Sequence, residues 1–324
     1  MLSNIKDAAH GGSGWIPRST SLRQEINGIW GDCGVSCEWS PLKAVLLHRP
    51  GSEIEGITDA NRVLMLSVPD SDLARRQHDG LANAYLKNGV DIYYVEPHRI
   101  PPPNQMFVAD LLLMTPEGAI IARPASMIRA GEERFVAQKL GKLGIPILRC
   151  VRGNGVFEGA DALWINPGTV MIGIGLRTNA EGADQVSALL REMDVEVVRI
   201  GLPSGTMHLM GVLRFVDRDH AICWESKIPK EAIRELKQRG FTISFIPDEQ
   251  EAVEGMALNF VTLSPDRILM PWNNHETQSF YEDRGITCTT IEVGEFHKAS
   301  GGIGCLTGVL NGNRQQKSNL CLLV

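Results

Sequence analysis

The sequence lacks long apolar runs and any excess of positive charge. No stretch approaches the roughly 20 apolar residues of a membrane helix, and residues 1–14 contain no apolar core of a secretory signal. The 32 basic and 38 acidic side chains give a formal net charge of −6, which argues against a nucleic acid held by bulk electrostatics. We therefore expect a cytoplasmic protein whose partners include neither a membrane nor a nucleic acid.

Cysteine is scarce and shows no paired spacing. The chain has seven cysteines, an odd number, and they are scattered along its length. Cys33 and Cys37 are separated by three residues and have no second pair, so the spacing predicts neither a zinc site nor a redox motif. We expect reduced thiols and no bound metal ion.

The composition excludes a disordered or fibrous chain, because 43% of the residues are hydrophobic and 22% are charged. A chain of 324 residues is long enough to bury a large core. Residues 1–38 are rich in glycine and serine, which predicts a loosely ordered lead-in. We expect a single domain over residues 39–324.

From Trp39 onward, a pattern of strand, helix and strand repeats along the chain. Its first occurrence joins a strand at Ala44–His48, a helix near Asp72–Lys87 and a strand at Val90–Val95. Four further helices are predicted near residues 132–143, 181–193, 229–239 and 276–284. β-rich runs follow them at residues 145–148, 195–200, 242–246 and 287–293, and hairpin-like pairs lie between units, as at residues 162–174 and 260–270. The helix starts lie about 50 residues apart, the period of a supersecondary repeat.

Two α/β layouts produce such a pattern. One is a doubly wound sheet, but no Gly-x-Gly-x-x-Gly turn follows a strand in this chain. The other is a ring of five short ββαβ blades around a central cavity. Five units in one chain favour the ring.

Four segments, each in a different repeat, place acidic residues, histidine or cysteine next to glycine. They occupy residues 103–110, 157–161, 207–211 and 301–308. The side chains in them that are able to do chemistry are Asp110, Glu158, Asp161, His208 and Cys305. Taken singly, each also fits a structural role, such as a buried thiol, a core histidine or a turn cap. Together they supply a nucleophile, an acid or base, and carboxylates for a cationic substrate.

The order and spacing of these segments resemble the guanidine-modifying superfamily, which includes arginine deiminases, dimethylarginine dimethylaminohydrolases and amidinotransferases. The resemblance runs from about Trp39 to Leu310. It implies a five-bladed ββαβ propeller, the pentein fold, with a central active site in a single catalytic domain. It also implies covalent thiol chemistry on a guanidinium carbon, with neither a metal nor an organic cofactor.

The sequence is most similar to the arginine deiminases. In that family an Asn stands six residues before the first guanidinium-binding Asp, as Asn104 stands before Asp110. An Arg follows that Asp by nineteen residues, and a second Arg follows the Glu of the next motif by nineteen. Arg129 and Arg177 occupy these positions here. The resemblance therefore implies that Asn104, Arg129 and Arg177 bind the α-carboxylate of an amino acid.

Two features depart from the arginine deiminase pattern. The helical subdomain that deiminases insert between the first two motifs is absent here, so the chain is the compact form, as in the dimethylarginine hydrolases. The deiminase motif His-x-Asp reads His208-Leu209-Met210 in this sequence. Met210 thus stands where a second guanidinium-binding carboxylate is expected. This substitution predicts tolerance of an N-substituted arginine.

The resemblance assigns a role to each remaining residue. Asp110 and Glu158 hold the guanidinium, Cys305 attacks its carbon, His208 is the acid and base, and Asp161 orients His208 or the substrate. The expected function is hydrolysis of the guanidino group of arginine or an N-substituted arginine, a small-molecule guanidino amino acid. The sequence leaves open amidino transfer to an amine, double hydrolysis to ornithine, a non-catalytic propeller that only binds, and a homo-oligomer.

Overall fold

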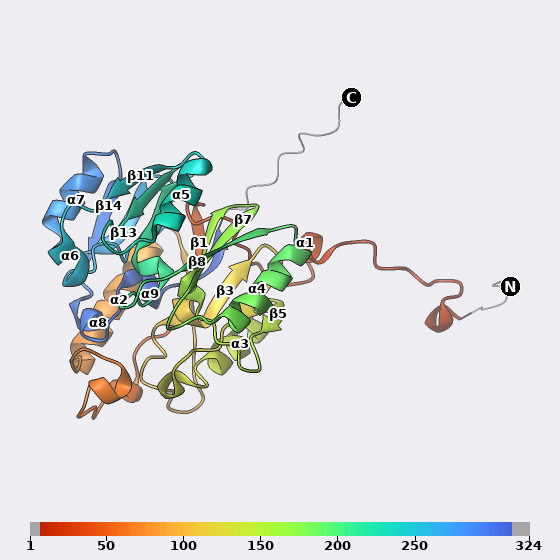
Figure 1. Ribbon diagram of the computed structural model, residues 1–324. Helices are drawn as coiled ribbons and strands as arrows, with labels where there is room; N and C mark the ends of the chain where they lie inside the picture. The colour runs from red at the N-terminus through yellow and green to blue at the C-terminus, as the bar shows by residue number, and fades with distance from the viewer. Residues whose placement is uncertain (1–6, 313–324) are drawn as a thin grey trace.

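Five small sheets form the body of the protein in the computed structural model, which describes residues 7–312 (Figure 1). Each sheet has three strands. The middle strand pairs antiparallel with one neighbour and parallel with the other. The parallel pair is joined through a helix, as parallel pairing requires a crossover. The predicted α/β class is therefore confirmed, with five repeated units.

In four of these units, the elements follow one another along the chain in the order strand, strand, helix and strand. They are β3 (Leu112–Thr115), β4 (Gly118–Ile121), α3 (Glu133–Lys142) and β5 (Ile147–Cys150); β6 (Ala162–Asn166), β7 (Thr169–Ile174), α4 (Ala180–Glu192) and β8 (Glu196–Gly201); β9 (Leu213–Asp217), β10 (His220–Cys223), α5 (Lys230–Gln238) and β11 (Thr242–Phe245); and β12 (Val261–Ser264), β13 (Arg267–Pro271), α7 (His275–Glu282) and β14 (Thr287–Ile291). The predicted helices and β-rich runs agree with these elements to within a few residues. The hairpins β3–β4 and β9–β10 complete the two units for which the sequence named none.

The fifth sheet joins strands that lie far apart in the sequence. Its elements are β1 (Leu42–Leu47), α2 (Ser71–Lys87), β2 (Asp91–Tyr94) and β15 (Gly308–Gly312). β15 pairs antiparallel with β1, with Leu46 opposite Gly308. The last strand therefore completes this unit, and β15 takes the place that the first strand has in the other four sheets.

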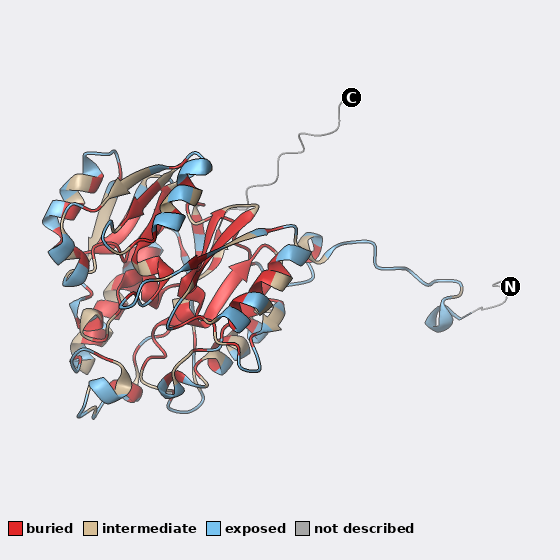
Figure 2. Ribbon diagram, viewed as in Figure 1, coloured by how far each residue is buried: buried red, intermediate tan, exposed pale blue. Residues whose placement is uncertain are grey.

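The third strand of each sheet is less buried than the other two. The first and middle strands are almost entirely buried, as in β3, β4 and β7, whereas the third strands β5, β11 and β14 are largely half-buried or exposed. Figure 2 shows the same trend, with red strands in the interior and the outer faces of the helices in blue. Runs such as Ile120-Ile121 and Val170-Met171-Ile172 are apolar because both faces of these strands are covered.

The helix ends follow local sequence signals. Asn179 precedes α4 and its side chain accepts a hydrogen bond from the Gly182 N–H. Pro229 precedes α5, and Gly240 beyond its end has a φ of +85°, a conformation that suits glycine. These signals determine the residues at which these helices begin and end.

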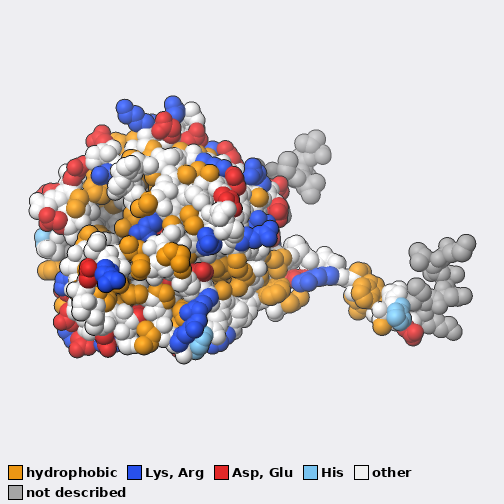
Figure 3. All heavy atoms as spheres, turned by 60° about the horizontal axis from the view of Figure 1, so that its bottom comes forward, with side chains coloured by type: hydrophobic (Ala, Val, Ile, Leu, Met, Phe, Trp, Pro, Cys, Tyr) orange, Lys and Arg blue, Asp and Glu red, His pale blue; other side chains and the backbone are white. Residues whose placement is uncertain are grey.

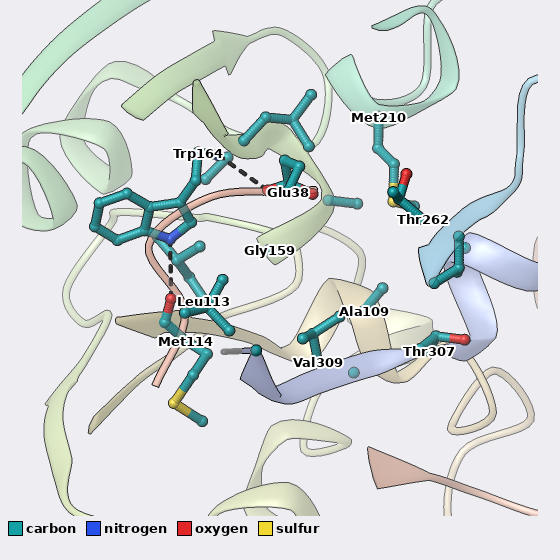
Figure 4. Close-up of a pocket in the computed structure, with 18 of the residues that line it drawn as sticks. Glu38, Ala109, Leu113, Met114, Gly159, Trp164, Met210, Thr262, Thr307 and Val309 are labelled. Carbon is teal, nitrogen blue, oxygen red and sulfur yellow. Dashed lines mark hydrogen bonds between the residues drawn. The ribbon is translucent and has the colours of Figure 1, made fainter. Parts of the chain in front are cut away.

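The first strands of all five sheets line one internal cavity of about 90 Å³ (Figure 4). They contribute, among others, Leu113, Leu163, Arg214, Thr262 and Val309. The sheets therefore surround a common interior, and the turns that precede their first strands lie close together.

The N-terminal segment divides into two parts. Residues 7–20 are mostly exposed and extend away from the body (Figure 1). Cys33 and Cys37 are buried, and the Gly34 N–H donates to the carbonyl of Leu310 in β15. The expected boundary at residue 38 stays a prediction, but residues 33–37 pack against the body. The short helices α1 (Leu22–Glu25), α6 (Glu249–Val253) and α8 (Gly294–Lys298) lie outside the repeated pattern.

Three further features concern the charged surface, the cysteines and the apolarity of the helices. Acidic and basic side chains are interspersed on the face in Figure 3. Six of the seven cysteines lie in the described part, where none forms a disulfide, and Cys321 lies outside it. Within residues 7–312, no helix combines the length and apolarity needed to cross a bilayer.

Candidate active site

Four short turns place the predicted chemical groups beside one another. Three are 3-10 turns before the first strand of a sheet: η4 (Val108–Leu111), η6 (Gly159–Asp161) and η7 (Leu209–Gly211). The fourth is the helical turn α9 (Ile303–Leu306), which precedes β15 and carries Cys305. Because the first strands surround the common cavity, these turns meet at one end of it.

A glycine allows two of these turns to approach closely. A Cβ at Gly159 would lie 2.1 Å from the Leu112 carbonyl oxygen and 2.4 Å from that of Ala109. No side chain fits at such distances, so glycine lets η6 pack directly on η4. This contact brings Glu158 next to Asp110, with carboxylate oxygens of the two residues within 4.8 Å of each other.

Arg129 lies at the centre of a buried network of carboxylates. Its Nη1 is 2.6 Å from Asp110 Oδ2 and 3.3 Å from Glu158 Oε2. Its Nε and Nη2 donate to Glu132 Oε2 at 3.0 and 2.8 Å. Arg177 Nη1 reaches Glu158 Oε1 at 3.4 Å. Burial raises the pKa of Glu132 to about 8 against the opposing effect of Arg129.

His208 forms an ion pair with Glu158. Its Nε2 donates to Glu158 Oε2 at 2.7 Å, and its Nδ1 lies 3.9 Å from Asp110 Oδ1. Burial alone would lower the pKa of His208, but Asp110 and the hydrogen bond with Glu158 outweigh it and raise the pKa to about 9. The same pairing lowers the pKa of Glu158 to about 2 despite its burial. His208 is therefore protonated at neutral pH and able to donate a proton.

Asp161 contacts the backbone next to His208 and not the imidazole. Its Oδ1 accepts from the Leu209 N–H at 3.0 Å, and its Oδ2 accepts from Thr178 Oγ1 at 2.7 Å. Burial raises the pKa of Asp161 to about 6. Any orienting effect on His208 thus passes through the peptide of Leu209.

Cys305 is held by Asn259, which precedes β12. Asn259 Nδ2 lies 3.0 Å from Cys305 Sγ, and Asn259 Oδ1 accepts from the Cys305 N–H at 3.2 Å. Burial raises the pKa of the thiol, and Asp110 raises it further, while the Asn259 N–H opposes both. A cation brought close to the sulfur would favour the thiolate for the same electrostatic reason.

One small cavity collects six of the nine predicted site residues. They are Asn104, Asp110, Arg129, Arg177, His208 and Cys305. Its volume of about 20 Å³ is enough for roughly one water molecule. A guanidino amino acid therefore fits only if groups such as the Arg129 and Arg177 side chains move. Asp110 Oδ1 is buried and has no hydrogen-bond partner among the described residues, so an acceptor is available to a substrate.

The other predicted residues lie around this cavity. Glu158 stands behind it, where it contacts His208 and both arginines, and Asp161 lies deeper. Met210 lines the internal cavity of Figure 4 and a larger cavity that also contains His208 and Cys305. Asn104 Nδ2 donates to the Val63 carbonyl at 2.8 Å, which uses one of its two N–H groups.

Sequence reasoning missed Asn259, Glu132 and Thr178. The repeat contains a signal for Asn259, because it stands two residues before the first strand of its unit, as Asp110 does in its own unit. The segment around Asn259 contains no acidic residue, histidine or cysteine, so the motif search did not select it. No local sequence signal marks Glu132 or Thr178. Only the folded chain brings them to Arg129 and Asp161, respectively.

Asp110, Glu158 and His208 also have the spacing of a metal-ligand set, with ligand atoms within 4.8 Å of one another. Two of them already contact a cation, the Arg129 guanidinium, and His208 is itself cationic below a pKa of about 9. The donor set therefore fits a planar guanidinium with several N–H groups better than an added divalent ion.

Comparisons with known proteins agree with this geometry. The family described as arginine deiminase matches residues 63–232, just over half of the chain, and this stretch holds every predicted site residue except Cys305. A dimethylarginine dimethylaminohydrolase from Pseudomonas aeruginosa is 26% identical over 268 residues, which are 82% of this chain and 98% of that protein. One from Streptomyces coelicolor is 28% identical over 269 residues, 82% of this chain and 96% of that protein.

Solved structures show the same relationship. A mutant of the Pseudomonas aeruginosa dimethylarginine dimethylaminohydrolase, complexed with citrulline, superposes with a TM-score of 0.70 at 25% identity. The match covers 82% of this chain and 98% of that one. The chain therefore belongs to the arginine deiminase family, within the superfamily of guanidino-modifying enzymes, and is a hydrolase of that class.

Proposed function

We propose that the protein hydrolyses the guanidino group of arginine or an N-substituted arginine through a covalent intermediate on Cys305. The observation that carries this proposal is a single cavity lined by the Cys305 thiol, the protonated His208 and the Asp110 carboxylate. A nucleophile, an acid and a carboxylate for a cation are the three groups that such a reaction needs.

In this proposal the substrate takes over contacts that Arg129 makes in the free protein. The guanidinium of the substrate binds Asp110 and Glu158, where the Arg129 guanidinium now lies. Arg129 stays attached to Glu132 through two hydrogen bonds and, with Arg177 and Asn104, binds the α-carboxylate. Charge-assisted hydrogen bonds of this kind are among the strongest that proteins make.

The reaction then proceeds in two balanced steps. The Cys305 thiolate attacks the guanidinium carbon, the bond from that carbon to one terminal nitrogen breaks, and His208 gives its proton to the departing amine. Water next attacks the S-alkylthiouronium carbon while His208 accepts a proton from it. The C–S bond breaks, the second proton of the water passes to the released amine through the solvent, and the ureido product and the restored thiolate result.

The proposal includes the arrangement of the five units. We infer that they close into a five-bladed propeller with this site at one end of its central cavity. Two observations support the closure: the first strands of all five sheets line one cavity, and β15 pairs with β1, far from it in the sequence.

The test is a product screen in a buffer without any acceptor amine. The protein is incubated with L-arginine, Nω-monomethyl-L-arginine and agmatine, and citrulline, ornithine, ammonia and methylamine are quantified. We expect citrulline together with ammonia or methylamine, and little reaction with agmatine, which lacks the carboxylate. Ornithine with two equivalents of ammonia would replace single by double hydrolysis. Product formation only after an amine is added would replace hydrolysis by amidino transfer. No product from any substrate would contradict catalysis.

A further inference from the structure

A second cavity meets the small one at the catalytic pair. It shares Met207, His208, Ser300 and Cys305 with the small cavity, and its volume is about 360 Å³ against about 20 Å³. Val253, which is 59% exposed, lines it and marks its opening to solvent. The sulfur and the imidazole are therefore reached from two sides.

The two cavities differ in the character of their walls. Asp110, Arg129 and Arg177 line the small one. Apolar side chains dominate the large one, and they include Met210, Val212, Trp224, Met256 and Leu258. Apart from His208 and Cys305, the only ionisable side chain among the described residues that line it is Lys227, and no carboxylate does so. The two cationic side chains, with no anion beside them, disfavour a cationic ligand group, and the apolar walls disfavour a charge of either sign and favour a neutral group.

We propose that this cavity, the apolar subsite, binds an apolar N-substituent on the guanidino group that is larger than a methyl group. This inference rests on the proposed function. The guanidinium carbon would lie at Cys305, the amino-acid part on the polar side, and an alkyl chain of three or more carbons in the apolar subsite. Met210 contributes to both the apolar subsite and the internal cavity, so the residue that replaces the expected carboxylate is part of the proposed wall.

The size of the apolar subsite exceeds what methyl groups need. A water molecule takes up about 30 Å³ of liquid, so about 360 Å³ accommodates roughly a dozen groups of that size. Each buried methylene contributes about 0.8 kcal/mol, which corresponds to about fourfold in affinity. Lengthening the substituent from methyl to propyl should therefore raise kcat/KM by about fifteenfold.

The subsite also specifies which bond breaks. The substituted nitrogen lies on the side of the apolar subsite, next to His208. When the thiolate has added, the bond between the guanidinium carbon and this nitrogen breaks, and the proton of His208 goes to it. The alkylamine then leaves through the open end, and water converts the remaining thiouronium to citrulline. Each turnover thus yields one alkylamine and one citrulline.

The experiment measures kcat/KM for Nω-methyl-, Nω-ethyl- and Nω-propyl-L-arginine in three proteins. They are the wild type, Gly211→Leu and Gly141→Leu. A Cβ at either glycine meets no atom within 4 Å and neither has a positive φ, but only Gly211 lines the apolar subsite. Gly141→Leu, on the exposed side of α3, is the matched control. We expect the fifteenfold rise in wild type and control, and less than a twofold rise in Gly211→Leu, with propylamine as the released amine.

Three results would overturn the inference while leaving hydrolysis intact. They are a fall in kcat/KM with chain length in the wild type, an equal rise in Gly211→Leu, and release of ammonia with N-propylcitrulline. The identity of the amine is read from the wild type alone, so the inference stays testable if Gly211→Leu fails to fold. Absence of citrulline from every substrate, L-arginine included, would instead contradict the proposed function itself.

Discussion

At the scale of the residue, each reactive group is held by a buried partner that sets its charge. Asp110 and Glu158 keep His208 protonated, and Asn259 lies against the Cys305 sulfur. The sequence identified Cys305, His208, Glu158 and Asp110 through motif and spacing, and the structure places them together. The sequence did not single out Asn259, because a lone amide before a strand resembles an ordinary turn residue.

Asn259→Ala should slow the reaction of Cys305 with chloroacetamidine. The Asn259 N–H stabilises the thiolate, and a hydrogen bond to a charged group contributes about 1.5–3 kcal/mol. The pKa of the thiol should rise further, and labelling at pH 8 should slow by about tenfold or more. Peptide mass spectrometry measures the rate, with the exposed Cys150 in the same sample as an internal control. An unchanged Cys305 rate would remove Asn259 from the thiolate's environment.

The His208–Glu158 pair should make stability depend on alkaline pH. The pKa of His208 is about 9 in the folded protein against about 6.5 unfolded. Its contribution is complete below pH 6.5 and is lost as the pH rises through 9. The free energy of unfolding should therefore fall between pH 6.5 and 9.5 by up to about 3 kcal/mol more in the wild type than in His208→Asn. Urea denaturation at both pH values measures this, and parallel losses in the two proteins would show that His208 does not titrate this way.

At the scale of the element, the short turns before the first strands determine the site. Their positions depend on close backbone contact, as at Gly159, and not on the helices that the repeat pattern predicts. The predicted helices agree with the structure to within a few residues because their caps and periodicity are local signals. The contacts between turns of different units are long-range, so spacing in the sequence cannot reveal them.

Gly159→Ala should separate η6 from η4. The new Cβ would lie 2.1 Å from the Leu112 carbonyl oxygen, so the turn must shift and move Glu158 away from Asp110. Overpacking of this kind costs about 1–3 kcal/mol, and displaced carboxylates should reduce kcat/KM by at least tenfold. Thermal melting and the citrulline assay measure the two effects. Gly201→Ala, where a Cβ meets nothing within 4 Å, is the control and should change neither. Wild-type stability in Gly159→Ala would refute the close contact.

The contacts of the Arg129 side chain also could not be predicted from the sequence. Its spacing from Asp110 predicted a carboxylate-binding role, which stays a prediction. In the free protein its guanidinium instead contacts Asp110, Glu132 and Glu158. A spacing rule gives the place of a residue in a family pattern, but it does not say which partner a flexible side chain selects when no substrate is bound.

At the scale of the whole molecule, the site combines segments that lie far apart in the sequence. Cys305 directly precedes β15, which completes the sheet of β1, while the carboxylates and His208 come from units in the middle of the chain. The five-unit organisation was predictable from the period of the helices. The common cavity and the two cavities that meet at Cys305 were not, since they arise where all units pack together.

The central claim, covalent catalysis by Cys305, is tested most directly by comparing wild type and Cys305→Ala during turnover of Nω-monomethyl-L-arginine. Acid quenching and peptide mass spectrometry should find the substrate-derived amidino adduct on Cys305 in the wild type. Cys305→Ala, which removes a single sulfur from a buried turn, should fold, carry no adduct and retain less than about a thousandth of wild-type kcat, equivalent to roughly 4 kcal/mol of barrier. Citrulline formation by folded Cys305→Ala above that level would contradict the covalent mechanism.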